Sequence, residues 1–202
     1  MKFTFFILLL VNIVACNQPT KRLPILGNPV VTGKDTAYPV ISSFQLINQD
    51  GQTVTNNTFN NKIYIADFIF LSCPTICPKM TKQMYNVYLP FATDSRVSFV
   101  SHTIDPENDS IPRLKKYAID LGVSTAKWHF LTGNQDSILK LAEQSYFSTA
   151  YPDSVAPGGF THSGGLLLVD KNRHIRGVYN GTRAEEADRL IKDIQILLKE
   201  QF

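Results

Sequence analysis

A pair of cysteines directly follows a continuous apolar stretch, and this junction constrains the fold more than any other part of the chain. The apolar stretch covers residues 63–71, and Cys73 and Cys77 come next. An unbroken apolar run of this length is typical of a buried strand. A helix is expected over residues 78–89, because its first residue is a proline, which fits a first helical turn. Both thiols are therefore predicted to lie where a buried strand passes into a helix.

The rest of the chain alternates between predicted strands and predicted helices. Apolar or alternating stretches predict strands at residues 41–48, 53–55, 96–104, 128–131, 166–170 and 174–179. Apolar residues at helical spacing, with their start and stop signals, predict further helices at residues 112–121, about 134–146 and 183–198. This order predicts an α/β fold with a central mixed sheet flanked by helices and an N-terminal β-hairpin. It resembles a thioredoxin-like layout, in which a reactive pair lies at the carboxyl end of a central strand.

The first fifteen residues resemble an export signal. Lys2 precedes an apolar stretch at residues 3–14, and a small residue stands before Cys16. The stretch is shorter than the roughly 20 residues of a membrane-spanning helix. A cysteine at this boundary resembles the lipidation site of a bacterial lipoprotein, although residues 13–15 lack the usual leucine. We expect a lipoprotein-type signal peptide at residues 1–15 and a lipidated Cys16; a plain signal peptide or an uncleaved anchor is the alternative.

One linker and one domain are expected after this signal. Residues 16–37 carry several prolines and glycines, which favours a flexible, irregular linker over a packed helix. Residues 38–202 suffice for one domain with a sizeable core, since 44% of the chain is hydrophobic. The formal net charge of +3, without a long basic run, argues against a nucleic-acid partner. We therefore expect a domain outside the cytoplasm, lipid-anchored to a membrane of the bacterial cell envelope.

Cys73 and Cys77 form a lone pair once Cys16 is assigned to the anchor. A disulfide between them would close a very small loop and would stabilise the fold little through the unfolded state. A helix N-terminus favours the thiolate, which is both the nucleophile and the metal ligand. Three residues separate the cysteines, one more than in thioredoxin-type oxidoreductases. The pair suits redox chemistry, binding of a soft metal such as Cu(I) or Zn(II), or both; an inert bridge is the remaining alternative.

The chain offers four histidines as candidates for a third metal ligand. His102 and His129 lie in or beside predicted strands and are expected to be packed or surface residues, and His174 is expected to be exposed. His162 ends a long irregular segment, residues 147–163, just before a predicted buried strand. Long loops inside compact domains are often functional, and in a thioredoxin-like fold this junction lies beside the reactive pair. His162 is thus the candidate ligand; a histidine that merely covers the site is the alternative.

Three other residues near the cysteines admit a metal-binding interpretation. Met80 and Met84 carry soft sulfur atoms, but their spacing matches the buried face of the predicted helix. Asp105 follows the next predicted strand, and its simpler role is to cap the turn into Pro106. We therefore expect both methionines to lie in the core and Asp105 to be structural.

Three segments of the sequence together resemble the Sco/SenC family. They are residues 72–78 (Ser-Cys-Pro-Thr-Ile-Cys-Pro), 105–109 (Asp-Pro-Glu-Asn-Asp) and 161–163 (Thr-His-Ser). The similarity covers roughly residues 38–198, in order. It implies a thioredoxin-like domain outside the cytoplasmic membrane that binds copper, as Cu(I) or Cu(II). It also implies a role in building the binuclear copper centre of cytochrome c oxidase.

The same resemblance implies that the copper ligands are Cys73, Cys77 and His162. Many members have Asp before the histidine, where this chain has Thr161, so the partner of the imidazole is left open. The implied function is a metallochaperone that delivers copper to the copper-bearing subunit of cytochrome c oxidase, or to another copper or thiol partner protein.

The alternative function is a membrane-anchored thiol–disulfide oxidoreductase that uses Cys73 and Cys77 as a redox pair on partner cysteines. Such a reductase would be an enzyme, whereas a chaperone would not. A peroxidase of the peroxiredoxin type is a weaker third alternative, because the sequence does not place an arginine and a threonine around the thiol.

Overall fold

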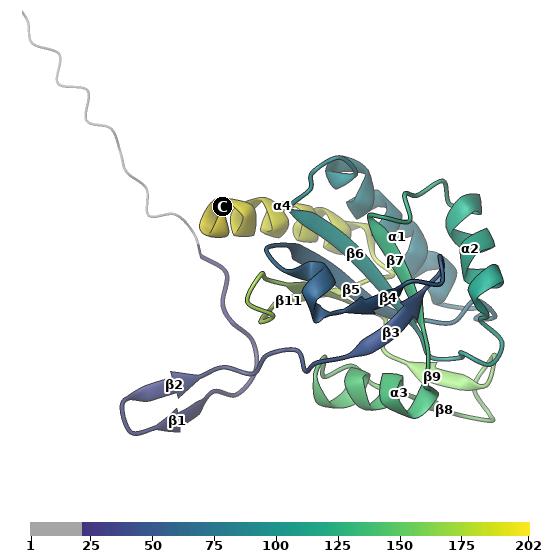
Figure 1. Ribbon diagram of the computed structural model, residues 1–202, viewed down its shortest axis with the longest axis horizontal. Helices are drawn as coiled ribbons and strands as arrows, with labels where there is room; N and C mark the ends of the chain where they lie inside the picture. The colour runs from purple at the N-terminus through teal and green to yellow at the C-terminus, as the bar shows by residue number, and fades with distance from the viewer. Residues whose placement is uncertain (1–21) are drawn as a thin grey trace, which may run out of the picture.

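A seven-stranded mixed sheet organises residues 22–202, which are the residues described by this computed structural model (Figure 1). Its strands are β3 Gln45–Asn48, β4 Thr53–Thr55, β5 Ile63–Ile69, β6 Val97–Thr103, β7 Trp128–Thr132, β10 Gly165–Val169 and β11 Ile175–Asn180. They lie in the order β11-β10-β5-β6-β7-β3-β4. The central strands β5, β6 and β7 are parallel, and the outer pairs are antiparallel. The expected signal peptide, residues 1–15, and Cys16 lie outside the described residues.

Helices cover this sheet, as the α/β prediction required. They are α1 Cys77–Phe91, α2 Ile111–Asp120, α3 Gln135–Gln144 and α4 Ala184–Gln201, and a short 3-10 helix spans Asn56–Phe59. Helices α1 and α4 pack against each other, and α4 also contacts β5 and β11. Figure 1 shows α3 at the lower side of the sheet, across from α4. The predicted N-terminal hairpin is present as β3 and β4, which pair antiparallel around the turn at Gly51.

Helix α1 begins at the cysteine pair for local reasons. Pro78 occupies its first turn, where the missing N–H group leaves no helical hydrogen bond unmade. The N–H of Met80 then donates to the carbonyl of Ile76 at 2.9 Å, which starts the helical ladder. Met80 and Met84 are fully buried against the sheet, so their assignment to the core is confirmed.

Two small hairpins were not predicted. Within the segment 147–163, expected to be irregular, β8 Ala150–Pro152 pairs antiparallel with β9 Phe160–His162. Within the expected linker, β1 Val30–Thr32 pairs with β2 Asp35–Ala37, and every residue of this second hairpin is exposed. Strands of three residues with Pro or Gly around them carry too short a pattern to be read from sequence.

The chain N-terminal to β1 lies against the sheet edge. The N–H of Leu26 donates to the carbonyl of Ile175 at 2.8 Å, and the Leu23 side chain is buried. His174, expected to be exposed, is half-buried instead, because Tyr38 packs its ring against the imidazole edge-on. Among the helices of the described residues, none has the length and apolar character needed to cross a membrane.

Candidate metal centre

The structure brings Cys73, Cys77 and His162 together. One ligand atom of each lies within 4.8 Å of the ligand atoms of the other two. Cys73 stands in the turn after β5, Cys77 is the first residue of α1, and His162 is the last residue of β9. Both cysteines are buried and free, and His162 is half-buried. Three elements distant in sequence therefore place two thiols and one imidazole in a single site.

The hydrogen bonds of His162 set its tautomer. Its Nδ1 lies 3.1 Å from the carbonyl oxygen of Ser163, which only accepts, so Nδ1 carries the proton. In a neutral imidazole the other nitrogen, Nε2, then offers a lone pair. That nitrogen lies 3.1 Å from the Cys77 sulfur, whose S–H group donates to it. A ligating histidine commonly donates its other N–H to a backbone carbonyl, so this arrangement presents Nε2 ready for a metal ion.

The pKa values of the two thiols are shifted in opposite directions. Burial disfavours the Cys73 thiolate, but hydrogen bonds from the backbone N–H groups of Cys77 and Thr75 outweigh burial, and the pKa of Cys73 lies below its ordinary value. Burial raises the pKa of Cys77 far above its ordinary value, and the neighbouring Cys73 acts in the same direction. Cys73 is consequently the thiol that ionises first.

The surroundings of His162 favour its neutral form. Burial lowers its pKa, although hydrogen bonding to the carbonyl of Ser163 opposes this effect. Phe70 contributes to that burial, because its ring meets the imidazole edge-on with the ring centroids 5.7 Å apart. A neutral imidazole is the form that binds metals.

The β8–β9 hairpin positions His162. Its register pairs Ala150 with His162, and the N–H of Ser163 donates to the carbonyl of Thr149 at 2.8 Å. Thr161, which replaces the aspartate common in the resembled family, donates its hydroxyl to the carboxylate of Asp153 at 2.8 Å. Thr161 thus stabilises the hairpin. The hydrogen-bond partner of the His162 Nδ1 is the backbone carbonyl of Ser163.

Residues 105–109 support the turn that carries the cysteines. The buried Asp109 carboxylate accepts hydrogen bonds from the N–H of Leu71, at 3.0 Å, and from the hydroxyl of Thr103, at 2.6 Å. It thereby ties Leu71, which lies between the end of β5 and Cys73, to the end of β6. Asp105 accepts two hydrogen bonds from the Asn108 amide and lies outside the ligand cluster, which agrees with a structural role. The sequence analysis did not identify this supporting role of Asp109.

The other histidines lie outside the cluster of described ligand atoms. His102 is fully buried and stacks on Phe68, with ring centroids 4.9 Å apart, and His129 is also buried. Burial lowers the pKa of each to about 4. Both are therefore packed core residues, one of the alternatives expected for them.

A second notable group is a buried carboxyl on β5. Asp67 is 1% exposed, and neither of its oxygens has a hydrogen-bond partner among the described residues. Burial raises its pKa to about 7. Asp67 also contributes to the high pKa of Cys77. The sequence placed this aspartate in a buried strand but gave no sign that it lacks a partner.

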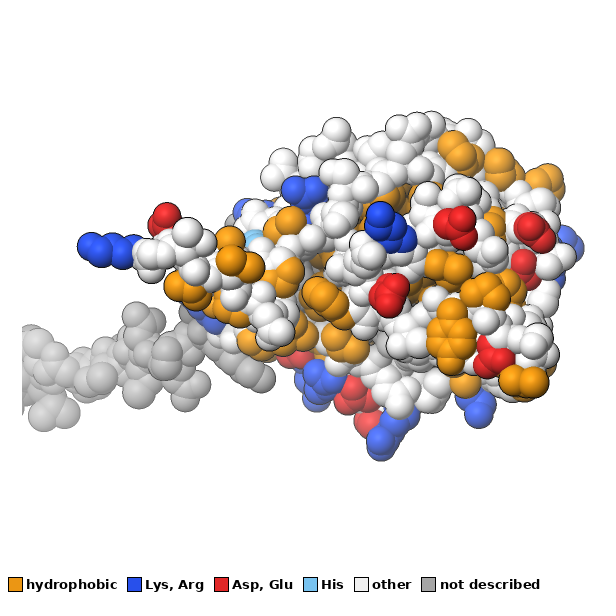
Figure 2. Space-filling model, turned by 90° about the horizontal axis from the view of Figure 1, so that it is seen from below, with side chains coloured by type: hydrophobic (Ala, Val, Ile, Leu, Met, Phe, Trp, Pro, Cys, Tyr) orange, Lys and Arg blue, Asp and Glu red, His pale blue; other side chains and the backbone are white. Residues whose placement is uncertain are grey.

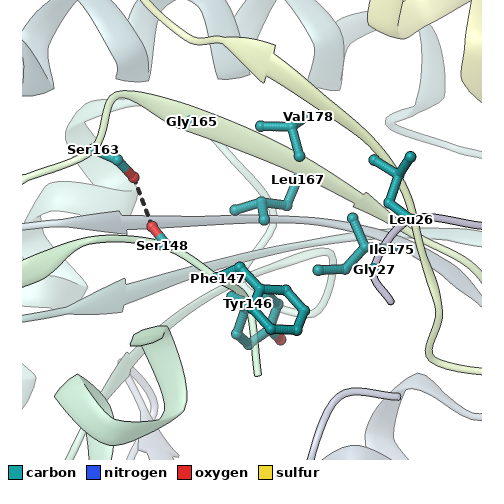
Figure 3. Close-up of a pocket in the computed structure, with 10 residues that line it drawn as sticks. All are labelled: Leu26, Gly27, Tyr146, Phe147, Ser148, Ser163, Gly165, Leu167, Ile175 and Val178. Carbon is teal, nitrogen blue, oxygen red and sulfur yellow. Dashed lines mark hydrogen bonds between the residues drawn. The ribbon is translucent and has the colours of Figure 1, made fainter. Parts of the chain in front are cut away.

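Two cavities adjoin the loop that carries His162. The first, of about 180 Å³, opens onto the site itself and is lined by Cys73, Thr75, Ile76, Ala156, Pro157, Phe160, Thr161 and His162. The second, of about 280 Å³, lies beside β10 and β11 (Figure 3). Its lining includes the hydrogen-bonded hydroxyls of Ser148 and Ser163 but no cysteine, histidine or carboxylate. Only the first of these two cavities is equipped to bind a metal.

Comparison with known proteins places this site in a family. A family model described as SCO1/SenC matches residues 32–199. The SCO1 protein homolog of Bacillus subtilis (strain 168) is 30% identical over 163 residues, which is 80% of this chain and 84% of the relative.

Solved structures agree. The SCO1/SenC family lipoprotein of Bacillus anthracis str. Ames has a TM-score of 0.72 at 28% identity, covering 79% of this chain and 95% of that one. BsSco, described as a member of the Sco family of cytochrome c oxidase assembly proteins with a disulfide switch, has a TM-score of 0.69 at 31% identity, covering 79% and 93%. Copper-bound ScoI of Bradyrhizobium japonicum has a TM-score of 0.63 at 25% identity, covering 76% and 98%.

These matches confirm the thioredoxin-like α/β fold and the resemblance drawn from the three sequence segments. The family model spans most of the chain, from the β1–β2 hairpin to the last turn of α4. The chain therefore belongs to the SCO1/SenC family.

Proposed function

We propose that this protein is a copper metallochaperone that binds copper through Cys73, Cys77 and His162 and passes it to a partner protein. The observation that carries the proposal is the convergence of two thiols and one imidazole in one recessed pocket. Two thiolates and one imidazole are soft and intermediate ligands, a set suited to Cu(I), and Cu(II) would accept a further oxygen ligand. Copper-bound Sco relatives support the choice of metal.

The three proposed ligands differ in how readily each is available to the metal. Cys73, with its lowered pKa, supplies a thiolate readily, and the lone pair of His162 Nε2 already faces the site. Cys77 must lose its proton when the metal arrives, because only the thiolate is a ligand. Metal binding therefore releases protons, and copper affinity is expected to rise with pH.

The copper-bearing subunit of cytochrome c oxidase is the proposed recipient, and another copper or thiol protein is the alternative. Support comes from the Sco family relative described as a cytochrome c oxidase assembly protein. We also propose that Cys16 is lipidated and holds residues 38–202 at a membrane of the bacterial envelope through the segment 16–37. A lipoprotein among the structural relatives supports this placement.

A thiol–disulfide oxidoreductase is the second candidate function. The thiol that ionises first, Cys73, and a protonated neighbour, Cys77, form a nucleophile and a resolving thiol. Oxidation of the pair to a disulfide would also remove two of the three copper ligands. The same chemistry would therefore switch copper binding off, and the disulfide switch described for BsSco supports this second role.

Anaerobic Cu(I) competition with a chelator tests the primary proposal. We expect replacement of His162 by alanine to weaken Cu(I) binding by about tenfold or more while the disulfide still forms, because a ligand is lost but both thiols remain. Fully oxidised wild type should bind no Cu(I) at this site. Equal Cu(I) affinity in wild type and His162→Ala would reject His162 as a ligand.

The turn of the β8–β9 hairpin offers a test of how His162 is positioned. A Cβ atom on Gly158, where φ is +85°, would lie 2.7 Å from the Phe70 ring, which itself packs on His162. Gly159 has the same φ of +85°, but a Cβ there would meet nothing within 4 Å. Both alanine variants therefore carry backbone strain of about 1–2 kcal/mol. Only in Gly158→Ala would the added methyl group also clash with the Phe70 ring and displace the hairpin from it.

We expect Gly158→Ala to lose about 1–3 kcal/mol more of its unfolding free energy than Gly159→Ala, as overpacked sites do. It should also bind Cu(I) more weakly, whereas Gly159→Ala should bind like wild type. Urea unfolding and Cu(I) competition measure the two effects. Equal Cu(I) affinities for the two variants would show that contact with Phe70 does not set the position of His162.

A further inference from the structure

The ligands of this site are recessed, and this would limit how a recipient takes copper from them. Cys73 and Cys77 are only 7% and 5% exposed, and they are reached through the cavity of about 180 Å³. Transfer by ligand exchange requires a recipient ligand within bonding distance of the ion. The recipient surface around that ligand must then cover the rim of the cavity.

The β8–β9 hairpin forms one side of this rim, and its exposed surface is apolar. Val155 is 91% exposed and Tyr151 is 48% exposed, and both Pro152 and Pro157 are exposed. We call these residues the hairpin surface: Tyr151, Pro152, Val155 and Pro157. Figure 2 shows hydrophobic side chains over much of the face seen from below, including its right half, the side on which Figure 1 places β8 and β9.

Charge is nearly absent from this hairpin. Asp153 is the single acidic or basic residue between Ala150 and His162, and its carboxylate already accepts from Thr161 and from the N–H of Val155. Exposed apolar residues beside a functional opening mark interaction surfaces, and tyrosines are frequent among the residues that dominate binding. The hairpin surface therefore suits an apolar contact and offers little for long-range electrostatic attraction.

The hairpin surface is also ordered before any partner arrives. The N–H of Asp153 donates to the carbonyl of Gly159 at 2.8 Å, and the N–H of Gly159 donates to the carbonyl of Ala156 at 2.9 Å. Val155 lies inside this closed turn, yet its side chain is almost fully exposed. A preformed surface binds without the entropic cost of ordering a loop.

From these observations we propose that the hairpin surface docks the copper-receiving protein, through an uncharged apolar patch that surrounds the recipient's own copper ligands. The proposal rests on the metallochaperone function. Copper stays Cu(I) throughout: each bond to a recipient ligand replaces one bond to Cys73, Cys77 or His162. A proton lost by a recipient thiol is balanced by a proton regained by a donor thiol.

Copper transfer to two different acceptors tests the docking surface. The protein acceptor is the reduced, copper-free soluble domain of the copper-bearing cytochrome c oxidase subunit from the same organism, and the second acceptor is a small Cu(I) chelator. Val155 is 91% exposed, so we expect Val155→Lys to leave the fold intact. Val31→Lys is the matched control, because Val31 is 66% exposed on the distant β1–β2 hairpin.

We expect Val155→Lys to slow transfer to the protein acceptor by about tenfold, as loss of a central apolar contact would. Val155→Ser should slow it in the same direction, since it removes the apolar contact without adding charge. The loss should persist at high salt, and transfer to the chelator should match wild type in every variant.

Wild-type transfer rates to the protein acceptor in Val155→Lys, or equal slowing by Val31→Lys, would overturn the docking surface. Slower transfer of Val155→Lys to the chelator would also overturn it, because the substitution would then act on the copper site. Failure of the wild type to hold Cu(I) in the chelator arm would instead contradict the proposed function and the docking surface together, so the two failures are distinguishable.

Discussion

Replacement of Arg176 by alanine is expected to lower the free energy of unfolding by about 3–5 kcal/mol, the cost of breaking a buried ion pair. The Arg176 side chain is only 4% exposed. Its guanidinium donates to the carboxylate of Asp170 at 2.9 Å and to that of Glu200 at 2.7 Å, and it also binds the carbonyls of Leu23 and Pro24. Its loss leaves Asp170, which is 1% exposed, without its cation.

The same substitution should release the chain that leads toward the N-terminus. Arg176 contacts two carbonyls of this segment, so its removal should expose the Leu26 amide, which now donates to Ile175. Urea unfolding and hydrogen exchange at Leu26 measure these effects. The control is Arg183→Ala, which breaks an ion pair to Glu185 with both side chains largely exposed and should therefore cost little stability. Similar losses in both variants would contradict the proposed role of Arg176 as a buried ion-pair partner that also holds residues 23 and 24.

The second large effect is a pH-dependent gain in stability on replacing Asp67 by asparagine. In the folded protein burial raises the Asp67 pKa to about 7, whereas an unfolded aspartate titrates near 3.9. The folded state therefore holds this proton more tightly, and the stability of the wild type falls as pH rises from about 4 to about 7. Asparagine carries no charge, so it avoids this loss.

We expect the stability advantage of Asp67→Asn over wild type to grow by about 2–4 kcal/mol between pH 4 and pH 8, from a shift of about three pKa units. Unfolding curves at several pH values measure it. Asp94→Asn is the control: the hydrogen bond from Arg96 lowers the pKa of Asp94 to about 2, so its effect on stability changes between about pH 2 and 4 and should stay nearly constant from pH 4 to pH 8. An advantage that does not change with pH would mean that Asp67 is not held protonated by burial.

Most of the fold follows from patterns that are local in sequence. The apolar stretch at β5, Pro78 at the start of α1 and the apolar spacing along α4 each carry their own signal, so the α/β order was predictable. The β8–β9 hairpin was not, because Pro152 and two glycines disfavour strands. What holds it in place includes the packing of Phe160 against Phe70, two residues far apart in sequence whose ring centroids lie 5.3 Å apart.

The residues that form the site could be predicted from the sequence, but the contacts that hold them in place could not. Two cysteines near a helix start and a histidine before a buried strand are visible in the sequence. The bond from the Leu71 N–H to Asp109 joins residues 38 positions apart, and the isolation of Asp67 depends on every element packed around it. Such contacts form only when the sheet is assembled, so no local sequence pattern predicts them.

The central claim is that Cu(I) is held by the sulfurs of Cys73 and Cys77 and by Nε2 of His162, and X-ray absorption at the copper edge tests it most directly. Wild type should show two sulfur ligands and one nitrogen ligand. Cys77→Ser should show a single sulfur, and His162→Ala should keep both sulfurs and lose the imidazole signal. A third sulfur in the wild type, as Met80 would supply, or an imidazole signal that survives in His162→Ala, would contradict the claim.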